Sequence, residues 1–146
     1  MASKASYFFS NPERGEVIIF NPPNHSRFPY IKRVIGLPGE TVEVKDGKVL
    51  INNIPINEGY IKEPPRYTMP PQKIPTDEYF VLGDNRNNAN DSHNGWTVPR
   101  ESIIGKAWFV YWPPGKWEVV KYYSYPELTG TGKQEATNLQ PGWSVT

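Results

Sequence analysis

Proline and glycine interrupt this chain so often that little room is left for long helices. The 146 residues include 16 prolines and 12 glycines. A proline inside a helix removes a backbone hydrogen bond and clashes with the preceding turn, and glycine is a poor helix former. Aromatic residues are abundant and alternate with Val and Ile, which favours strands. We therefore predict a mainly β chain with very little helix.

Short apolar runs bounded by turn residues mark the predicted strands. The run 16–20 is apolar on both faces, which is typical of a central strand. Residues 41–44 and 48–51 flank Asp46-Gly47, the strongest short-range signal of a β-hairpin. Further strands are predicted at residues 30–35, 78–82 and 103–112, and residues 52–53 are predicted to form a turn into residues 54–56. Six or more strands, mostly antiparallel, indicate a compact barrel-like or sandwich domain.

The remaining segments set the predicted domain boundaries. Five prolines between residues 58 and 75 predict an extended excursion over the surface. Residues 99–102 are expected to form one helical turn, and residues 1–11 resemble the end of an earlier strand. After Val120 the apolar pattern dissolves. We predict one β domain over residues 1–120, followed by a polar and mobile tail over residues 121–146.

Composition excludes several classes of function. The net charge is +1, so nothing indicates a nucleic-acid-binding surface. The chain has no cysteine, which excludes thiol catalysis and zinc–thiolate sites, and its two histidines, His25 and His93, cannot form a multi-histidine metal centre. No apolar run approaches the roughly 18 residues of a membrane-spanning helix.

Two stretches carry the candidate chemistry. Residues 83–93 (GDNRNNANDSH) form a long polar loop directly after a predicted strand, and residues 30–40 (YIKRVIGLPGE) place a Lys-Arg pair inside another strand. Such a polar loop is either a solvated turn or a site that the surrounding strands hold in place. We expect the two stretches to meet in space.

Lys32 and Arg33 have two interpretations each. On spacing alone, Lys32 is most often a solvated edge charge. If it is buried, its pKa falls, and the neutral amine can act as a general base towards a neighbouring hydroxyl. Arg33 points to the opposite face and needs an acceptor, for which Asp84 is the natural candidate. The pair is either a weak surface contact or a clamp that holds the polar loop against the Lys32 strand.

Asp91 and His93 also remain open to two interpretations. The carboxylate can accept a hydrogen bond from the imidazole, or it can cap the backbone of its own turn. Asp84, Asn88 and Asp91 do not fit the spacing of a calcium-binding loop. We therefore expect no metal ion and no cofactor.

Three stretches together resemble the bacterial type I signal peptidases, which are Ser/Lys serine proteases. Residues 14–20 (RGEVIIF) are similar to the family's R-G-D-I-V-V-F strand, and residues 30–40 nearly repeat the box that carries its general-base lysine. Residues 83–86 (GDNR), continued by Asp91 and Ser92, are similar to the family's G-D-N-R-x-x-S-x-D-S box. The resemblance covers roughly residues 4 to 115.

Within that family, three features of this sequence resemble the cyanobacterial and plastid branch. These features are the Asn-rich loop ending in Asp-Ser-His, residues 107–109 (AWF) and residues 112–114 (WPP).

The resemblance implies a role for each site residue. Lys32 would be the general base of a serine-type endopeptidase, and Arg33 and Asp84 would form a structural salt bridge. The rest of the box would support that lysine: Asn85, Arg86, Ala89, Asp91, Ser92 and His93. The implied fold is a β-rich catalytic core, and the implied substrates are exported preproteins cut after small side chains, usually Ala-x-Ala.

This sequence departs from the family pattern in two ways. The nucleophile box S-M-x-P is absent, and we expect it, with an N-terminal membrane anchor, to precede the present residues; this chain alone should then be inactive. Ala89 stands where the family has a serine that hydrogen-bonds the lysine. The full-length enzyme would sit in the membrane with its catalytic domain on the periplasmic or lumenal face. The alternative is a non-catalytic relative that binds signal peptides or a partner peptidase.

Overall fold

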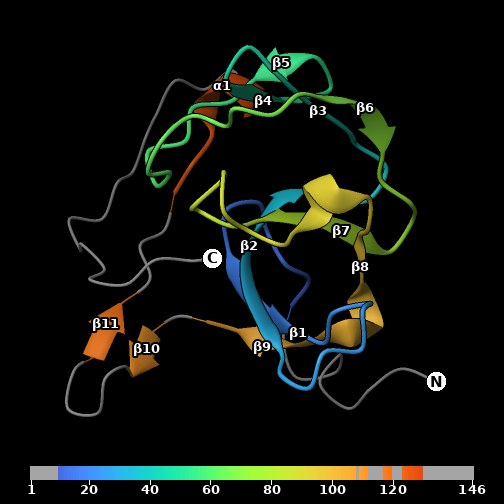
Figure 1. Cartoon of the computed structure of the whole chain (residues 1–146), viewed down its shortest axis with the longest axis vertical. Coiled ribbons are helices and arrows are strands. Elements are labelled where there is room, and N and C mark those ends of the chain that lie inside the picture. Colours follow the sequence, from blue (N-terminus) through green and yellow to red (C-terminus); the bar gives the residue numbers. More distant parts are fainter. Residues whose placement is uncertain (1–9, 108, 112–116, 120–122, 130–146) are drawn as a thin grey trace.

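Two antiparallel sheets stacked on each other make up most of the molecule (Figure 1). The structure is a computed structural model and describes residues 10–107, 109–111, 117–119 and 123–129. The first sheet has the strand order β8-β7-β2-β1-β9, and the second has the order β5-β4-β3-β6. All pairings within them are antiparallel, and the described residues include one short α-helix. The predicted mainly β fold is confirmed.

The first sheet carries both sequence stretches of interest. Its strands are β1 (Val17–Phe20), β2 (Tyr30–Gly36), β7 (Glu78–Leu82), β8 (Val98–Pro99) and β9 (Ile103–Lys106). β2 lies in the middle, between β1 and β7, and β1 is also an interior strand, as its apolar run predicts. The polar loop 83–93 follows β7 directly, so it begins beside β2.

The second sheet contains the predicted hairpin. Its strands are β3 (Thr41–Lys45), β4 (Lys48–Ile51), β5 (Ile54–Pro55) and β6 (Met69–Lys73). Asp46 and Gly47 join β3 to β4 with φ angles of +52° and +77°. Positive φ at both central residues is the geometry of a type I′ turn, which matches the twist of the two strands.

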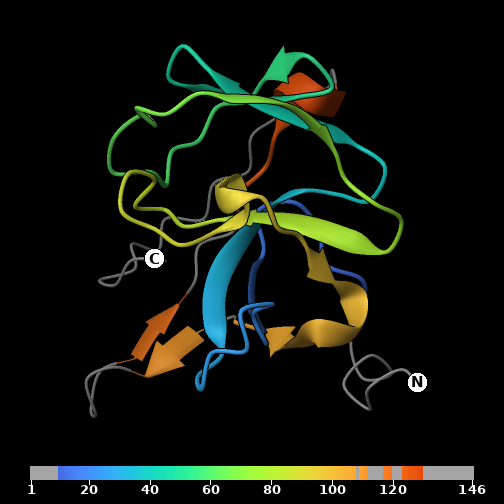
Figure 2. The same cartoon turned by 45° about the vertical axis from the view of Figure 1, so that its right-hand side comes forward.

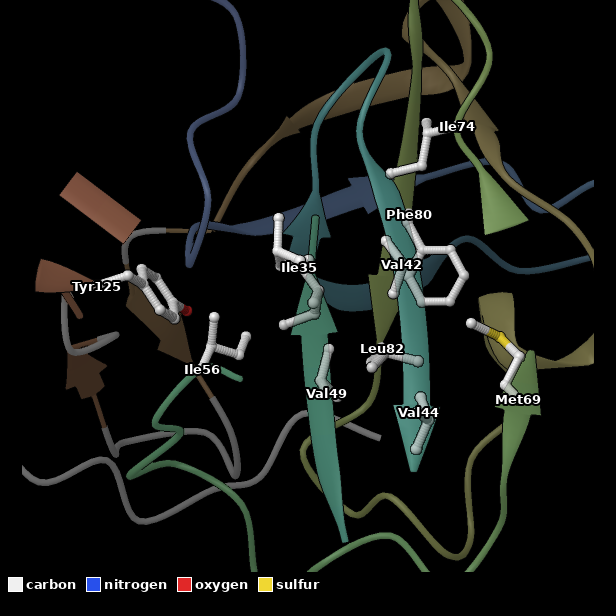
Figure 3. Close-up of a cluster of buried hydrophobic side chains, with 11 residues drawn as sticks. Ile35, Val42, Val44, Val49, Ile56, Met69, Ile74, Phe80, Leu82 and Tyr125 are labelled. Atoms are coloured by element: carbon white, nitrogen blue, oxygen red, sulfur yellow. The ribbon is translucent and has the colours of Figure 1, made fainter. Parts of the chain in front are cut away.

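β2 and β7 have apolar side chains on both faces, and this creates two hydrophobic clusters. On the face towards the second sheet, Ile35, Phe80 and Leu82 pack among side chains of β3, β4 and β6 (Figure 3). Figure 2 shows this second sheet stacked over the first from another side. On the opposite face, Val34 and Val81 pack in a cluster with residues of β1, β8 and β9. Successive residues of β2 therefore point into different surroundings.

Two strand predictions are wrong in their details. Residues 69–73 of the expected surface excursion form β6, whose two prolines are exposed on an edge strand, where the missing N–H groups are tolerated. The single strand predicted over 103–112 is two strands in different sheets. β9 ends at Lys106, and β10 (Phe109–Tyr111) pairs with β11 (Trp117–Val119) in a separate ribbon. The short helical turn is confirmed as a 3-10 turn at Arg100–Ser102.

The chain does not leave the core at residue 120, where the sequence predicts the tail to begin. Tyr125 is buried in the cluster between the sheets, and helix α1 (Pro126–Thr129) follows it. The Glu127 carboxylate accepts a hydrogen bond from the Asn57 backbone N–H at 2.7 Å. Residues 123–129 thus belong to the folded body, because one aromatic ring finds apolar surroundings there. The rest of the predicted tail, and the predicted strand end at residues 1–9, lie outside the described residues.

Gly36 allows the sheets to approach, and its substitution tests this packing. A Cβ atom at Gly36 would lie 2.7 Å from Val42 Cγ2 and would also collide with Ile74 Cδ1. We expect Gly36→Ala to lower the free energy of unfolding by about 1–3 kcal/mol, because overpacking forces neighbours to move. Urea unfolding measures the change. Gly105→Ala, where a Cβ meets nothing within 4 Å, is the control; equal losses for both variants would contradict this account.

Candidate active site

Lys32 is buried in the middle of β2, so it is not the solvated edge charge that strand spacing alone favours. Its residue exposure is 5%. Lys32 stands opposite Ile18 across the β1–β2 ladder, and its Nζ lies 5.7 Å from the centroid of the Tyr30 ring. Among the described residues, no hydrogen-bond or ion-pair partner contacts this Nζ. Burial lowers the pKa of Lys32, while the negative charges of Asp91 and Asp84 oppose that change.

Arg33 and Asp84 form a buried bidentate ion pair, as the sequence predicts. Arg33 Nε donates to Asp84 Oδ1 at 2.9 Å, and Nη2 donates to Oδ2 at 2.7 Å. The remaining Nη1 donates to the Gly15 carbonyl at 2.8 Å. Burial opposes the charge of Arg33, but the hydrogen bonds and charge of Asp84 raise its pKa, so the guanidinium stays ionised. The surface-pair interpretation is wrong: this contact ties the start of the polar loop to β2.

Arg86 is a second buried cation and holds the polar loop from the other side. Its side chain is fully buried; Nε donates to the Gly83 carbonyl at 2.8 Å. Nη1 and Nη2 contact the two oxygens of Glu58 at 2.7 and 2.5 Å. Glu58 lies at the start of the proline-rich segment, so this ion pair ties that segment to the loop.

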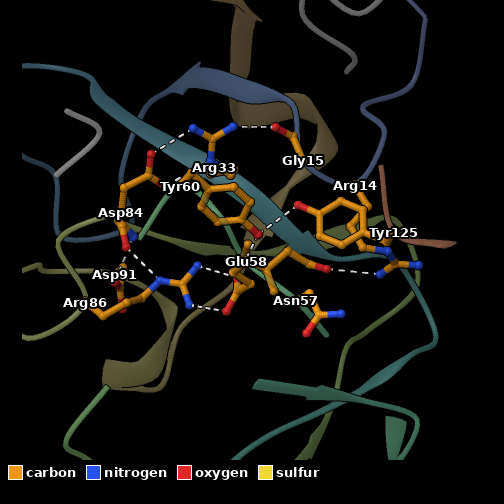
Figure 4. A network of polar contacts seen from close by, with 12 residues as sticks. Arg14, Gly15, Arg33, Asn57, Glu58, Tyr60, Asp84, Arg86, Asp91 and Tyr125 are labelled. Atoms are coloured by element: carbon orange, nitrogen blue, oxygen red, sulfur yellow. Dashed lines mark hydrogen bonds and ion pairs between the residues drawn. The ribbon is translucent and has the colours of Figure 1, made fainter. Parts of the chain in front are cut away.

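Tyr60 connects the two ion pairs (Figure 4). Its hydroxyl donates to Glu58 Oε2 at 2.7 Å and lies 2.8 Å from the Tyr125 hydroxyl. Its ring lies 4.2 Å from the guanidinium carbon of Arg33. The sequence analysis missed Glu58, Tyr60 and Tyr125. One signal in the sequence was available: Arg86 lies in the polar loop 83–93, and a buried arginine needs a carboxylate partner from elsewhere in the chain.

Asp91, Ser92 and His93 hold the far end of the loop against β7. Asp91 Oδ2 accepts from the Gly83 N–H at 3.0 Å, and Ser92 Oγ accepts from the Val81 N–H at 2.9 Å. Asp91 Oδ1 accepts from the His93 N–H at 3.0 Å and also contacts His93 Nδ1. The two interpretations of Asp91 therefore occur together, because one carboxylate caps the turn and contacts the imidazole.

Asn85 and Ala89 make fewer polar contacts than the other predicted site residues. The Asn85 carbonyl accepts from the Asn88 N–H at 3.1 Å, which closes a turn within the loop. Ala89 is half-buried and lines a cavity on the outer side of the loop. Its methyl group offers no hydrogen bond to a neighbouring amine.

The two predicted stretches meet, and their meeting places one unpartnered amine beside fixed charges. Arg33 contacts Asp84, and Asn90 Nδ2 donates to the Tyr30 hydroxyl at 3.2 Å. Both contacts join β2 to loop 83–93. A buried lysine with a lowered pKa can accept a proton from a hydroxyl brought next to it. The arrangement therefore suits general-base chemistry.

Comparison with known proteins finds a matching family model and relatives that are all named as signal or processing peptidases. A family model described as "Signal peptidase, peptidase S26" matches residues 1–112. The chain is 49% identical over 120 residues to signal peptidase I of Leptolyngbya laminosa, which covers 77% of this chain and 59% of the relative. It is 44% identical over 126 residues to the chloroplastic thylakoidal processing peptidase 1 of Arabidopsis thaliana, covering 80% of this chain and 37% of that protein.

A solved structure shares the fold. The crystal structure of a signal peptidase I from Enterococcus faecalis V583 superposes with a TM-score of 0.61 at 31% sequence identity. The match covers 68% of this chain and 98% of that one. The chain spans only 59% and 62% of the length of its cyanobacterial relatives from Leptolyngbya laminosa and Synechocystis. The cyanobacterial and plastid likeness seen in the sequence is confirmed.

Removal of the Glu58 charge tests the buried network. We expect Glu58→Gln to lower the free energy of unfolding by about 3–5 kcal/mol, because it leaves the buried Arg86 guanidinium without its counter-charge. Chemical denaturation measures the loss. Glu63→Gln is the matched control, since Glu63 is half exposed and its contact with Arg66 is long, at 3.4 Å. Its expected effect is about 0–1 kcal/mol. A Glu58→Gln variant as stable as the control would contradict a structural role for this pair.

Titration of Lys32 by NMR tests its environment. We expect the pKa of the Lys32 amine to lie below the value that lysines show in the urea-unfolded chain, because burial disfavours the ammonium. Asp91→Asn removes a negative charge that raises this pKa, so the Lys32 pKa should fall further. Asp46→Asn, in the distant hairpin turn, should leave it unchanged. A Lys32 that titrates like an unfolded-chain lysine would refute this assignment.

Proposed function

Because this chain belongs to the signal peptidase family, peptidase S26, we propose that it forms the core of a signal peptidase I with Lys32 as the general base. The observation that carries the proposal is the burial of the Lys32 amine in β2, without a fixed partner among the described residues and with Asp91 nearby. Because burial lowers its pKa, a larger fraction of this amine is neutral at near-neutral pH than in a solvated lysine, and the neutral form can remove a proton.

The proposed reaction uses a serine hydroxyl from an S-M-x-P segment, a motif that these 146 residues do not contain. Lys32 Nζ takes the proton of that hydroxyl while the serine oxygen attacks the scissile carbonyl carbon. The protonated Lys32 then gives its proton to the departing amine as the peptide bond breaks. In the second half, Lys32 removes a proton from water while the water oxygen attacks the acyl carbon. The ester bond to the serine oxygen then breaks, and Lys32 returns the proton to that oxygen.

The other site residues support this chemistry without touching the substrate bond. Arg33 and Asp84 fix the start of loop 83–93 on β2, and Arg86 fixes its course. Asp91 holds the end of the loop and supplies a negative charge that stabilises the lysinium formed in each proton transfer. Asn85, Ala89, Ser92 and His93 complete the loop. Ala89 has no hydroxyl, so Lys32 lacks the hydrogen-bond partner that the family pattern provides at this position.

The proposed substrates are preproteins whose signal peptides end in small side chains such as Ala-x-Ala. Since the relatives include a thylakoidal processing peptidase, the proposed location is a membrane surface, with the catalytic core on the periplasmic or lumenal side. In the described part of the chain, no helix has the length and apolar character needed to cross a lipid bilayer.

A second candidate is a non-catalytic relative that binds signal peptides or a partner peptidase. Ala89 favours it, since Lys32 is then aimed by packing alone. In that case a version of the protein carrying S-M-x-P would bind a precursor without cutting it.

Cleavage by a version of this chain preceded by an S-M-x-P segment and a hydrophobic span tests both candidates. We expect it to cut a precursor after Ala-x-Ala, and Lys32→Ala to lower kcat by about 10²–10⁴, the usual contribution of a general base. Lys48→Ala, at an exposed lysine of β4, should retain full activity. If Lys32→Ala cleaves as fast as the parent protein, the proposed mechanism is wrong. If the parent protein binds the precursor without cleaving it, the second candidate is established.

A further inference from the structure

A polar cavity of about 550 Å³, open to solvent, lies between the proline-rich segment and loop 83–93. One wall comes from Arg66 and Tyr67 in the proline-rich segment, and the other comes from the loop and its continuation, with Asn88, Asn90, His93 and Asn94. The Tyr67 ring of the first wall stacks on the His93 ring of the second, with centroids 4.1 Å apart and an interplanar angle of 15°. Arg86, whose guanidinium is paired with Glu58, also lines this cavity, whereas Lys32 and the ion pair of Arg33 with Asp84 do not.

Besides this ring stack, the side chain of Asn87 ties the two walls together, so the cavity is pre-formed. Asn87 Oδ1 accepts from the Arg66 backbone N–H at 2.7 Å. Asn87 Nδ2 donates to Glu63 Oε1 at 2.9 Å and to the Pro64 carbonyl at 3.0 Å. A ligand that enters between the walls therefore meets groups already held in place, which reduces the entropic cost of binding.

The lining groups suit a polar peptide with negative charge. The described residues that line the cavity carry no carboxylate, and Arg66 presents a guanidinium whose side chain is 76% exposed and loosely paired with Glu63. Asn94 Nδ2 donates to Asn90 Oδ1 at 2.9 Å, which orients these two carboxamides. Their remaining donor and acceptor positions, and the carboxamide of Asn88, can pair with the backbone of an extended peptide. The Arg66 guanidinium can hold a carboxylate through two parallel hydrogen bonds.

The cavity shares a side chain with the surroundings of Lys32. Asn90 lines the cavity, and its Nδ2 donates to the Tyr30 hydroxyl at 3.2 Å. The Tyr30 ring in turn lies 5.7 Å from Lys32 Nζ. A peptide bound near Lys32 can thus continue past Asn90 into the cavity.

We propose that this cavity binds the first residues of the mature chain, on the carboxyl side of the cleavage point, and favours acidic side chains there. The inference rests on the proposed function. A signal peptide consists of a basic segment, an apolar segment and small residues before the cut. Arg66 repels the first, and the polar lining does not suit the second. The residues after the cut are the part of a preprotein that can carry acidic side chains.

Fluorescence anisotropy with labelled synthetic peptides tests the cavity on this chain itself. The probe contains Ala-x-Ala followed by a polar segment with two glutamates, and a second peptide has glutamine in their place. We expect the glutamate peptide to bind about fivefold more tightly to the native chain, the upper range for an exposed charge pair. In Arg66→Gln this preference should vanish. In Lys73→Gln, which removes another exposed positive charge at the far end of β6, it should persist.

The same measurements separate this inference from the proposed function. A glutamate preference that survives in Arg66→Gln, or an absence of peptide binding at millimolar concentration, would overturn the cavity assignment. Neither result affects the Lys32 cleavage test. Conversely, Asn88→Ala should weaken binding of both peptides alike, while Lys32→Ala should leave the glutamate preference intact. If Lys32→Ala abolishes the preference, the glutamates bind outside this cavity, and the assignment is likewise overturned.

Discussion

The bidentate ion pair between Arg33 and Asp84 is the interaction on which the geometry of the site depends. Neighbouring residues of a strand point to opposite faces, so fixing Arg33 on one face of β2 also fixes Lys32 on the other. Asp84 reaches Arg33 because it lies two residues after Leu82, the last residue of β7, which is opposite Arg33 in the β2–β7 ladder. One ion pair thus sets both the start of loop 83–93 and the direction of the amine. Buried pairs of this kind often add little net stability, and their best-supported role is to select one arrangement over others.

The second ion pair extends this arrangement to parts of the chain that are distant in sequence. Glu58 precedes Arg86 by 28 residues, and Tyr125 follows Tyr60 by 65. The Tyr60 ring lies against Arg33, and its hydroxyl contacts both Glu58 and Tyr125. The polar loop is therefore held by side chains from the proline-rich segment and from the C-terminal segment, and not by β2 and β7 alone.

Local sequence patterns were sufficient for most strands of the two sheets and for one half of the site. Asp46-Gly47 specifies its turn through backbone geometry, and the Arg33–Asp84 contact follows from two motifs that each need a partner. β6 and Tyr125 could not be predicted in the same way. Two prolines disguise an edge strand, and a single buried tyrosine in a polar segment has no periodic pattern. The burial of Lys32 is likewise a tertiary property, because strand spacing alone favours exposure. Ile18 of β1 stands opposite Lys32, and Asp84 and Asp91 of loop 83–93 act on its charge.

β2 contributes to two hydrophobic clusters at once, with Ile35 in the one between the sheets and Val34 in the one on the opposite face. Neither cluster can lose its packing without exposing a strand that the other one needs. The molecule should therefore unfold cooperatively, as one thermodynamic unit, with no stable half-folded form in which one sheet survives alone. Amide hydrogens along β2 should then exchange with solvent only through global opening, so the amine at its centre remains in a fixed environment for as long as the protein is folded.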